Sequence, residues 1–175
     1  IEFEREDYNA MVQLNITSLT ELCHLAIPDL IKKGGGGIIN VGSTASFVPI
    51  PFSAVYGSTK AYVLMFSEAL RYEVAGKNIN VMALCPGATK SKFSQVAVEK
   101  ASEELKKFNA DLVQKDQAGD SSKSVAVEGL NAFLQNKSYV ITGKANKKFA
   151  WLPRILPRDK IVKMAGDTFK KRLLK

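Results

Sequence analysis

The sequence predicts an α/β fold built around a parallel sheet. Three short apolar runs, residues 37–41, 79–84 and 138–141, have the length and composition of buried strands. Longer segments with a helical spacing of apolar residues separate these runs, so that helices and strands alternate along the chain. Such alternation is typical of a parallel sheet whose faces are covered by helices.

The helices are predicted from their apolar spacing and from the residues at their ends. Residues 4–33 form one long predicted helix, and the glycines at 34–37 are expected to end it and to form the next loop. A helix over 53–75 is expected to use Ser53 as its N-cap and to stop at Gly76. Further helices are predicted over 96–108, 124–134 and 160–174. The apolar residues available for one face of the first helix are Leu14, Leu19, Leu22, Ala26 and Leu30.

The composition is that of a piece of one soluble α/β domain. The chain has 175 residues, of which 46% are hydrophobic and 24% are charged. Its apolar runs are shorter than the roughly 20 residues that a membrane-spanning helix needs. Cys23 and Cys85 show no metal-binding spacing, so reduced thiols in a cytoplasmic protein are expected. Because His24 is the single histidine, no metal site is predicted.

Ser43, Tyr56 and Lys60 are the candidate catalytic residues. Ser43 falls at the carboxyl end of the predicted strand 37–41, and Tyr56 and Lys60 share a helix face because they are four positions apart. The Lys60 ammonium would lower the phenol pKa from its ordinary value of about 10. Such a phenol can act as a general acid or base, and Ser43 can donate a hydrogen bond to the same substrate oxygen. The alternative is that Tyr56 and Lys60 are an ordinary pair on an amphipathic helix and that Ser43 is a turn residue.

Three sequence blocks resemble the short-chain dehydrogenase/reductase family, in that family's order. They are Ile38-Ile39-Asn40-Val41-Gly42-Ser43-Thr44-Ala45-Ser46, Tyr56-Gly57-Ser58-Thr59-Lys60 and Cys85-Pro86-Gly87-Ala88-Thr89-Lys90-Ser91. The resemblance implies part of a doubly wound Rossmann domain: its last three strands with flanking helices, followed by a basic C-terminal helix. It also implies an oxidoreductase that transfers a hydride between a nicotinamide and a carbonyl or secondary alcohol substrate, and a homo-oligomer.

The resemblance implies a role for each candidate catalytic residue. Tyr56 would be the acid/base, and Ser43 would orient the reacting oxygen. Lys60 would lower the Tyr56 pKa and hold the nicotinamide ribose. Asn15, at the end of the block Met11-Val12-Gln13-Leu14-Asn15, would position a water in the proton relay to Lys60. The alternative for Asn15 is a surface or helix-kinking asparagine.

The resemblance also implies a cofactor-binding segment after the predicted strand 79–84. The implied cofactor-binding residues are Tyr56, Lys60, Pro86, Gly87, Thr89 and Ser91. Pro86 ends the strand and Gly87 lets the main chain approach a flat ligand closely, although Pro-Gly is also an ordinary turn. The expected cofactor is NAD or NADP, with NADP preferred.

A glycine-rich phosphate-binding turn between a strand and a helix is missing from the sequence. The glycines at 34–37 have the wrong order for one, because they follow a helix and precede a strand. We therefore expect the first, nucleotide-binding half of the domain to lie outside this sequence. The alternative hypothesis is a non-catalytic binding or scaffolding fragment with one unpaired sheet edge.

The sequence divides into a domain portion and a basic tail. Residues 1–146 are interpreted as the C-terminal portion of the Rossmann-type domain, in which 92–123 is either a substrate lid or an ordinarily packed helix. Residues 147–175 form a basic amphipathic tail, with Asp159 available as the N-cap of its helix.

The positive charge of the chain is concentrated near its end. Residues 121–175 hold 13 Lys or Arg against 3 acidic residues, whereas the rest of the chain carries a net charge of −2. The tail can cap the substrate pocket, or it can lie on an anionic membrane surface as a peripheral contact. Nucleic-acid binding is not predicted, because no recognition fold accompanies the charge.

Overall fold

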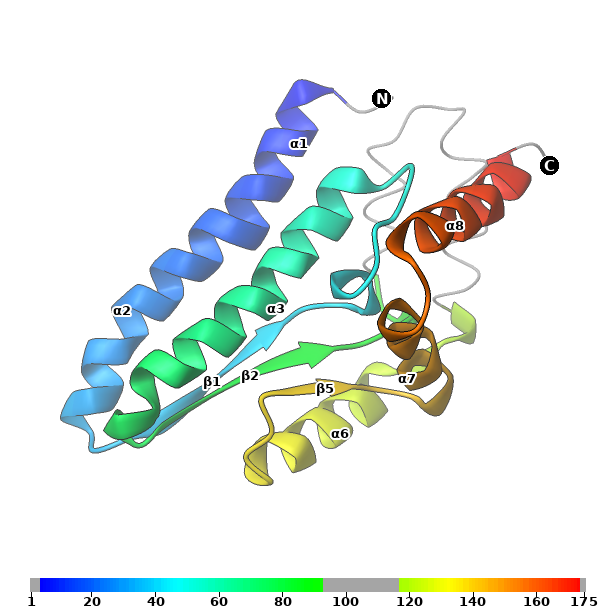
Figure 1. Ribbon diagram of the computed structural model, residues 1–175. Helices are drawn as coiled ribbons and strands as arrows, with labels where there is room; N and C mark the ends of the chain where they lie inside the picture. The colour runs from blue at the N-terminus through cyan, green and yellow to red at the C-terminus, as the bar shows by residue number, and fades with distance from the viewer. Residues whose placement is uncertain (1–3, 93–116, 174–175) are drawn as a thin grey trace.

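A three-stranded parallel sheet forms the centre of the computed structural model, which describes residues 4–92 and 117–173 (Figure 1). The strands β1 (Gly36–Val41), β2 (Ile79–Cys85) and β5 (Tyr139–Ile141) pair in the order β1-β2-β5. Each begins and ends within one residue of its predicted bounds. The predicted α/β architecture with a parallel sheet is confirmed.

The predicted helix over 4–33 is present but is divided into three parts. They are α1 (Arg5–Val12), a π-helical segment (Gln13–Ser18) and α2 (Leu19–Lys32). The glycine run ends α2 as predicted: Gly34 has φ +80°, and the N–H of Gly35 donates to Leu30 O at 2.9 Å. Because the π-helical segment contains Asn15, the helix is irregular at a predicted site residue.

The prediction that Leu14 and Leu22 lie on the buried helix face is wrong. Their side chains are 70% and 66% exposed. The face of α2 that packs on the sheet instead carries residues three or four positions apart, and they are Leu19, Cys23, Ile27 and Leu30. Cys23, a small hydrophobe, is the fully buried member of this row.

Helices cover both faces of the sheet. On one face, α3 (Ala54–Val74) and α2 meet Val81 of β2 in one apolar cluster. On the other face, α6 (Ser122–Leu134) packs against Met82 of β2, since side chains alternate along a strand (Figure 1). Neighbouring residues of β2 therefore contact helices on opposite faces of the sheet.

The two ends of α3 differ in detail from the prediction. Ser53 occupies the N-cap position of α3, but its side chain makes no capping hydrogen bond. Past the other end, a 3₁₀ turn (Ala75–Lys77) contains Gly76, and the left-handed residue is Asn78 with φ +57°. Asn78 takes that role because its amide also donates to Gly34 O at 2.9 Å, a tertiary contact that local sequence does not reveal.

The C-terminal part contains elements that the sequence analysis missed. A short parallel pair joins β3 (Thr89–Lys90) to β4 (Asp120–Ser121), and α7 (Lys144–Trp151) follows β5. Strands of two residues and a lysine-rich helix lack a detectable apolar period. The predicted helix over 96–108 and most of the predicted lid segment lie outside the described residues.

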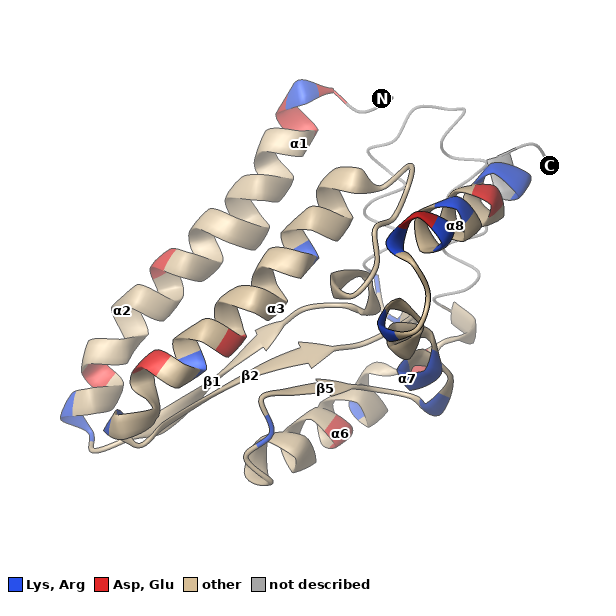
Figure 2. Ribbon diagram, viewed as in Figure 1, with Lys and Arg blue, Asp and Glu red and all other residues tan. Residues whose placement is uncertain are grey.

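The final helix, α8 (Arg158–Leu173), begins two residues earlier than predicted. Asp159 therefore lies in its first turn instead of at its N-cap. Ile161 is buried, and Gly166 faces Pro51 in the loop before α3. That this helix caps a substrate pocket stays a prediction. Figure 2 shows basic residues gathered on α7 and α8. Peripheral membrane contact through them stays a prediction.

Among residues 4–92 and 117–173, no helix is both long and apolar enough to cross a bilayer.

Candidate active site

Helix α3 brings Tyr56 and Lys60 together at the carboxyl end of the sheet. The Nζ atom of Lys60 lies 5.9 Å from the centroid of the Tyr56 ring and donates a hydrogen bond to Val41 O at 3.0 Å. Burial lowers the pKa of Lys60, and the nearby Cys85 thiol partly offsets this. The half-buried cation is thus held between the end of β1 and the phenol ring.

Ser43 lies two residues after the end of β1 and is 9% exposed. It caps the 3₁₀ turn Thr44–Ser46: its Oγ accepts a hydrogen bond from Ala45 N at 3.1 Å, while its own N–H donates to Ser46 Oγ at 3.2 Å. Because the backbone amide of Ala45 occupies one lone pair, the hydroxyl hydrogen of Ser43 remains able to donate.

The turn that carries Ser43 is fixed to the end of β2. Gly42 N–H donates to Leu84 O at 2.8 Å, and Thr44 N–H donates to Pro86 O at 2.9 Å. A Cβ at Gly42 would lie 3.0 Å from Cys85 Sγ, so only glycine fits this approach without displacement. Burial raises the pKa of the Cys85 thiol to about 11, which keeps it neutral.

Asn15 reaches helix α3 through a residue that the sequence analysis did not single out. Its Nδ2 donates to Thr59 Oγ1 at 3.1 Å, and Thr59 Oγ1 donates to Tyr56 O at 2.9 Å. Thr59 is 1% exposed, so its side of this part-buried bridge is shielded from solvent. Only its position in the sequence could have indicated this role: Thr59 comes three residues after Tyr56 on the same helix, directly before Lys60.

The predicted cofactor segment forms a turn and a short strand after β2. Thr89 lies in β3 and donates through Oγ1 to Gly87 O at 3.0 Å, and Ser91 is exposed just beyond. A Cβ at Gly87 would meet the side chain of Asn146 of α7. Glycine at this position therefore makes room for Asn146. The roles of these residues toward a cofactor stay predictions.

One buried hydroxyl at this end of the sheet lacks a partner within the described ranges. Thr142, directly after β5, is 1% exposed and its Oγ1 has no hydrogen-bond partner there. A buried hydroxyl is normally satisfied. The carboxyl end of β5 therefore carries a polar atom that is unpaired among the described residues.

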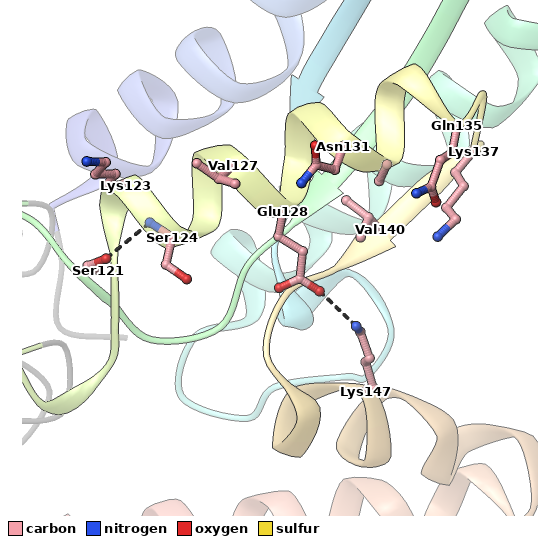
Figure 3. A pocket seen from close by; sticks show the side chains of 11 residues that line it. Ser121, Lys123, Ser124, Val127, Glu128, Asn131, Gln135, Lys137, Val140 and Lys147 are labelled. Atoms are coloured by element: carbon pink, nitrogen blue, oxygen red, sulfur yellow. Dashed lines mark hydrogen bonds and ion pairs between the residues drawn. The ribbon is translucent and has the colours of Figure 1, made fainter.

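A groove lies elsewhere, between α6 and the sheet edge at β5. It has a volume of about 560 Å³, and Lys123, Glu128, Lys137 and Lys147 are among its lining residues (Figure 3). Lys147 pairs with Glu128 at 2.8 Å and holds the pKa of that carboxyl below its usual value. Predicted catalytic residues are not part of its lining. Within the described ranges, no cluster of His, Cys, Asp or Glu is suited to a metal ion.

The short chain dehydrogenase family model matches residues 1–103, which contain all the predicted site residues. The chain belongs to the short-chain dehydrogenase/reductase family. Curated relatives include sulfoacetaldehyde reductase of Chromohalobacter salexigens, 40% identical over 94 residues, and serine 3-dehydrogenase of Agrobacterium fabrum, 37% identical over 91 residues. The alignments cover 53% and 52% of this chain but 37% and 36% of those relatives' own lengths.

Solved structures of the family share this fold. A short-chain dehydrogenase from Sphingobium yanoikuyae in complex with NADPH has a TM-score of 0.63 and 24% identity, and the match covers 98% of this chain and 57% of that one. A family member from Burkholderia phymatum in complex with NAD has a TM-score of 0.78 and 15% identity, with coverage of 87% and 60%. The chain thus has the fold of part of a Rossmann-type dehydrogenase.

Proposed function

We propose that this chain forms the catalytic part of an NAD- or NADP-dependent oxidoreductase that interconverts a carbonyl compound and an alcohol. The observation that carries the proposal is the Lys60 ammonium, half-buried and 5.9 Å from the centroid of the Tyr56 ring, beside the strand end that presents Ser43. An ammonium near a phenol favours loss of the phenolic proton.

The proposed roles follow from this geometry. Tyr56 exchanges a proton with the substrate oxygen, and the Lys60 charge favours the ionised phenol that results. Ser43 donates its hydroxyl hydrogen to the same oxygen. Its Oγ accepts the N–H of Ala45, and this leaves the hydroxyl hydrogen able to donate. Asn15 steadies the helix turn of Tyr56 through Thr59. The cofactor, when bound, supplies or accepts the hydride at the substrate carbon.

The described residues fit the nicotinamide end of such a cofactor. Lys60 offers a cation at the carboxyl edge of the sheet, the main chain from Pro86 to Ser91 lines that edge, and Thr142 leaves a buried hydroxyl unpaired there. Relatives of known structure were solved with NADPH, NAD or NADP, which supports a nicotinamide cofactor. The preference for NADP stays a prediction.

Replacement of Tyr56 by Phe in the full-length protein tests the proposal. The probes are sulfoacetaldehyde with NADH or NADPH, and serine with NAD or NADP, chosen from the names of two relatives. We expect Tyr56→Phe to lower the turnover rate by about 10²–10⁴-fold, the usual contribution of general acid–base catalysis. The matched control is Tyr72→Phe, on the same helix and 86% exposed, which should keep full activity. Wild-type turnover in Tyr56→Phe would reject the proposal.

A non-catalytic binding or scaffolding role is the second candidate. In the described part of the chain, β1 pairs with β2 alone, so its outer edge is available to another strand. Fluorescence titration of the full-length protein with NADH and NADPH separates the two. Saturable binding supports the oxidoreductase, whereas no binding by a folded chain supports the scaffolding role.

A further inference from the structure

The Ser46 hydroxyl connects two of the predicted catalytic residues. Its Oγ accepts the N–H of Ser43 at 3.2 Å and donates to the main-chain carbonyl of Lys60 at 2.7 Å. The first contact lies within one turn, but the second joins residues 14 positions apart in the sequence. A single hydroxyl therefore links the end of β1 to the middle of α3.

We propose that Ser46 is a positioning residue, which fixes the distance between Ser43 and the helix turn that carries Tyr56 and Lys60. The inference rests on the proposed function, because it concerns the alignment of that function's acid/base with its hydrogen-bond donor. Small misplacements of catalytic groups cost large factors in rate. Because the two partners of the Ser46 hydroxyl are a backbone amide and a backbone carbonyl, the tie holds the main chain on both sides.

The surroundings of Ser46 restrict where its oxygen can lie. A Cβ at Gly42 would be 3.2 Å from this oxygen and 3.0 Å from Cys85 Sγ, so the main chain passes close to both. The Lys60 carbonyl belongs to the interior of α3, where the helix keeps it in place. The hydroxyl is thus confined on one side by the strand-end turn and on the other by the helix.

A hydroxyl is needed because it accepts and donates at once. Alanine does neither, and it removes the hydroxyl acceptor from the nearly buried N–H of Ser43. Threonine keeps both functions. A purely local role of Ser46 in capping its turn predicts a loss of stability alone, whereas the positioning role predicts a change in the chemical step.

The experiment compares Ser46→Ala with Ser46→Thr in the full-length protein, using sulfoacetaldehyde with NADPH or NADH. We expect Ser46→Ala to lower kcat by about tenfold with little change in the cofactor KM, and Ser46→Thr to restore most of the loss. Hydrogen exchange measured by mass spectrometry should show the Ser43 amide exchanging about tenfold faster in Ser46→Ala. Ser124→Ala, an exposed serine on the opposite face of the sheet, is the control for both readouts.

The outcomes separate this inference from the proposed function. Unchanged kcat in Ser46→Ala, together with loss of turnover in Tyr56→Phe, overturns the positioning role and leaves the proposed function intact. Wild-type turnover in Tyr56→Phe removes the proposed function instead. If the wild-type protein turns over none of the probes, exchange at the far side of the tie decides: faster exchange of the α3 amides around Lys60 in Ser46→Ala supports the tie, and an unchanged rate there overturns it.

Discussion

The two ends of helix α3 use their cationic side chains differently. Near its C-terminus, Arg71 donates to Asn80, to Val81 O at 3.0 Å, and to the backbone and side chain of Asn136 at 2.8 and 2.6 Å. Near the other end, Lys60 donates to Val41 O and lies over the Tyr56 ring. Arg71 fastens the helix to the amino ends of the strands, whereas Lys60 directs its charge toward a candidate catalytic phenol.

This difference separates a structural cation from a proposed catalytic one. The planar guanidinium of Arg71 spans α3, β2 and the turn before β5, which a single ammonium cannot do. Burial of the Lys60 ammonium is unfavourable, as its lowered pKa indicates, and its contacts offset this cost less than those of Arg71 do. Groups kept for chemistry commonly reduce stability in this way.

The largest expected effect is on catalysis, through Lys60→Met. We expect turnover of the sulfoacetaldehyde probe to fall by about 10²–10⁴-fold, because the charge near Tyr56 is lost. The free energy of unfolding should stay within about 1 kcal/mol of wild type, since relief of desolvation offsets the lost bond to Val41 O. Steady-state kinetics and urea unfolding at pH 7 measure both quantities. Lys77→Met, in an exposed turn, is the control for charge removal.

The lowered pKa of Lys60 predicts how stability changes with pH. Its pKa is lower in the folded chain than the ordinary 10.5, so the unfolded chain binds the proton more tightly. The cost is therefore fully present at neutral pH and is relieved as the pH rises from the folded pKa toward 10.5. Wild type should gain stability relative to Lys60→Met over that window. A constant difference between the two would contradict the desolvation argument.

The next largest effect is on stability, through Arg71→Met. Loss of its hydrogen bonds leaves Asn80 and Asn136 without charged donors, so we expect the free energy of unfolding to fall by about 2–4 kcal/mol. Arg71→Lys should recover only part of this, because lysine lacks the planar fork. Urea unfolding midpoints measure the change. A midpoint equal to wild type in Arg71→Met would remove the contrast between the two cations.

The smallest effect is expected at the pair formed by Glu128 and Lys147. Its carboxylate is 36% exposed, so after screening by solvent Glu128→Gln should cost about 0.5 kcal/mol at pH 7. The hydrogen bond from Lys147 lowers the Glu128 pKa from its ordinary 4.5, so this stability is present above pH 4.5 and is lost as the pH falls through the folded value. Unfolding at pH 7 and pH 3 measures this. Asp29→Asn, whose pair with Lys32 is more exposed, should change less.

The sequence was sufficient for the elements that have a strong apolar period. The three strands and the helices over α3 and α6 were predictable, because buried parallel strands appear as short apolar runs and amphipathic helices repeat every three to four residues. The pairing of Tyr56 with Lys60 was also predictable, since four positions on one helix fix it. Short β3 and β4 carry no such period and escaped prediction.

The sequence by itself determined the parallel α/β pattern, the helix face shared by Tyr56 and Lys60, and the position of Ser43 at a strand end. Only the tertiary structure decided which hydroxyls join these residues: Ser46 to Lys60 O, and Thr59 between Asn15 and Tyr56. The physical reason is distance along the chain. Local periodicity reports which face a residue occupies, whereas a hydrogen bond across 14 or 44 positions depends on how helices pack against the strands.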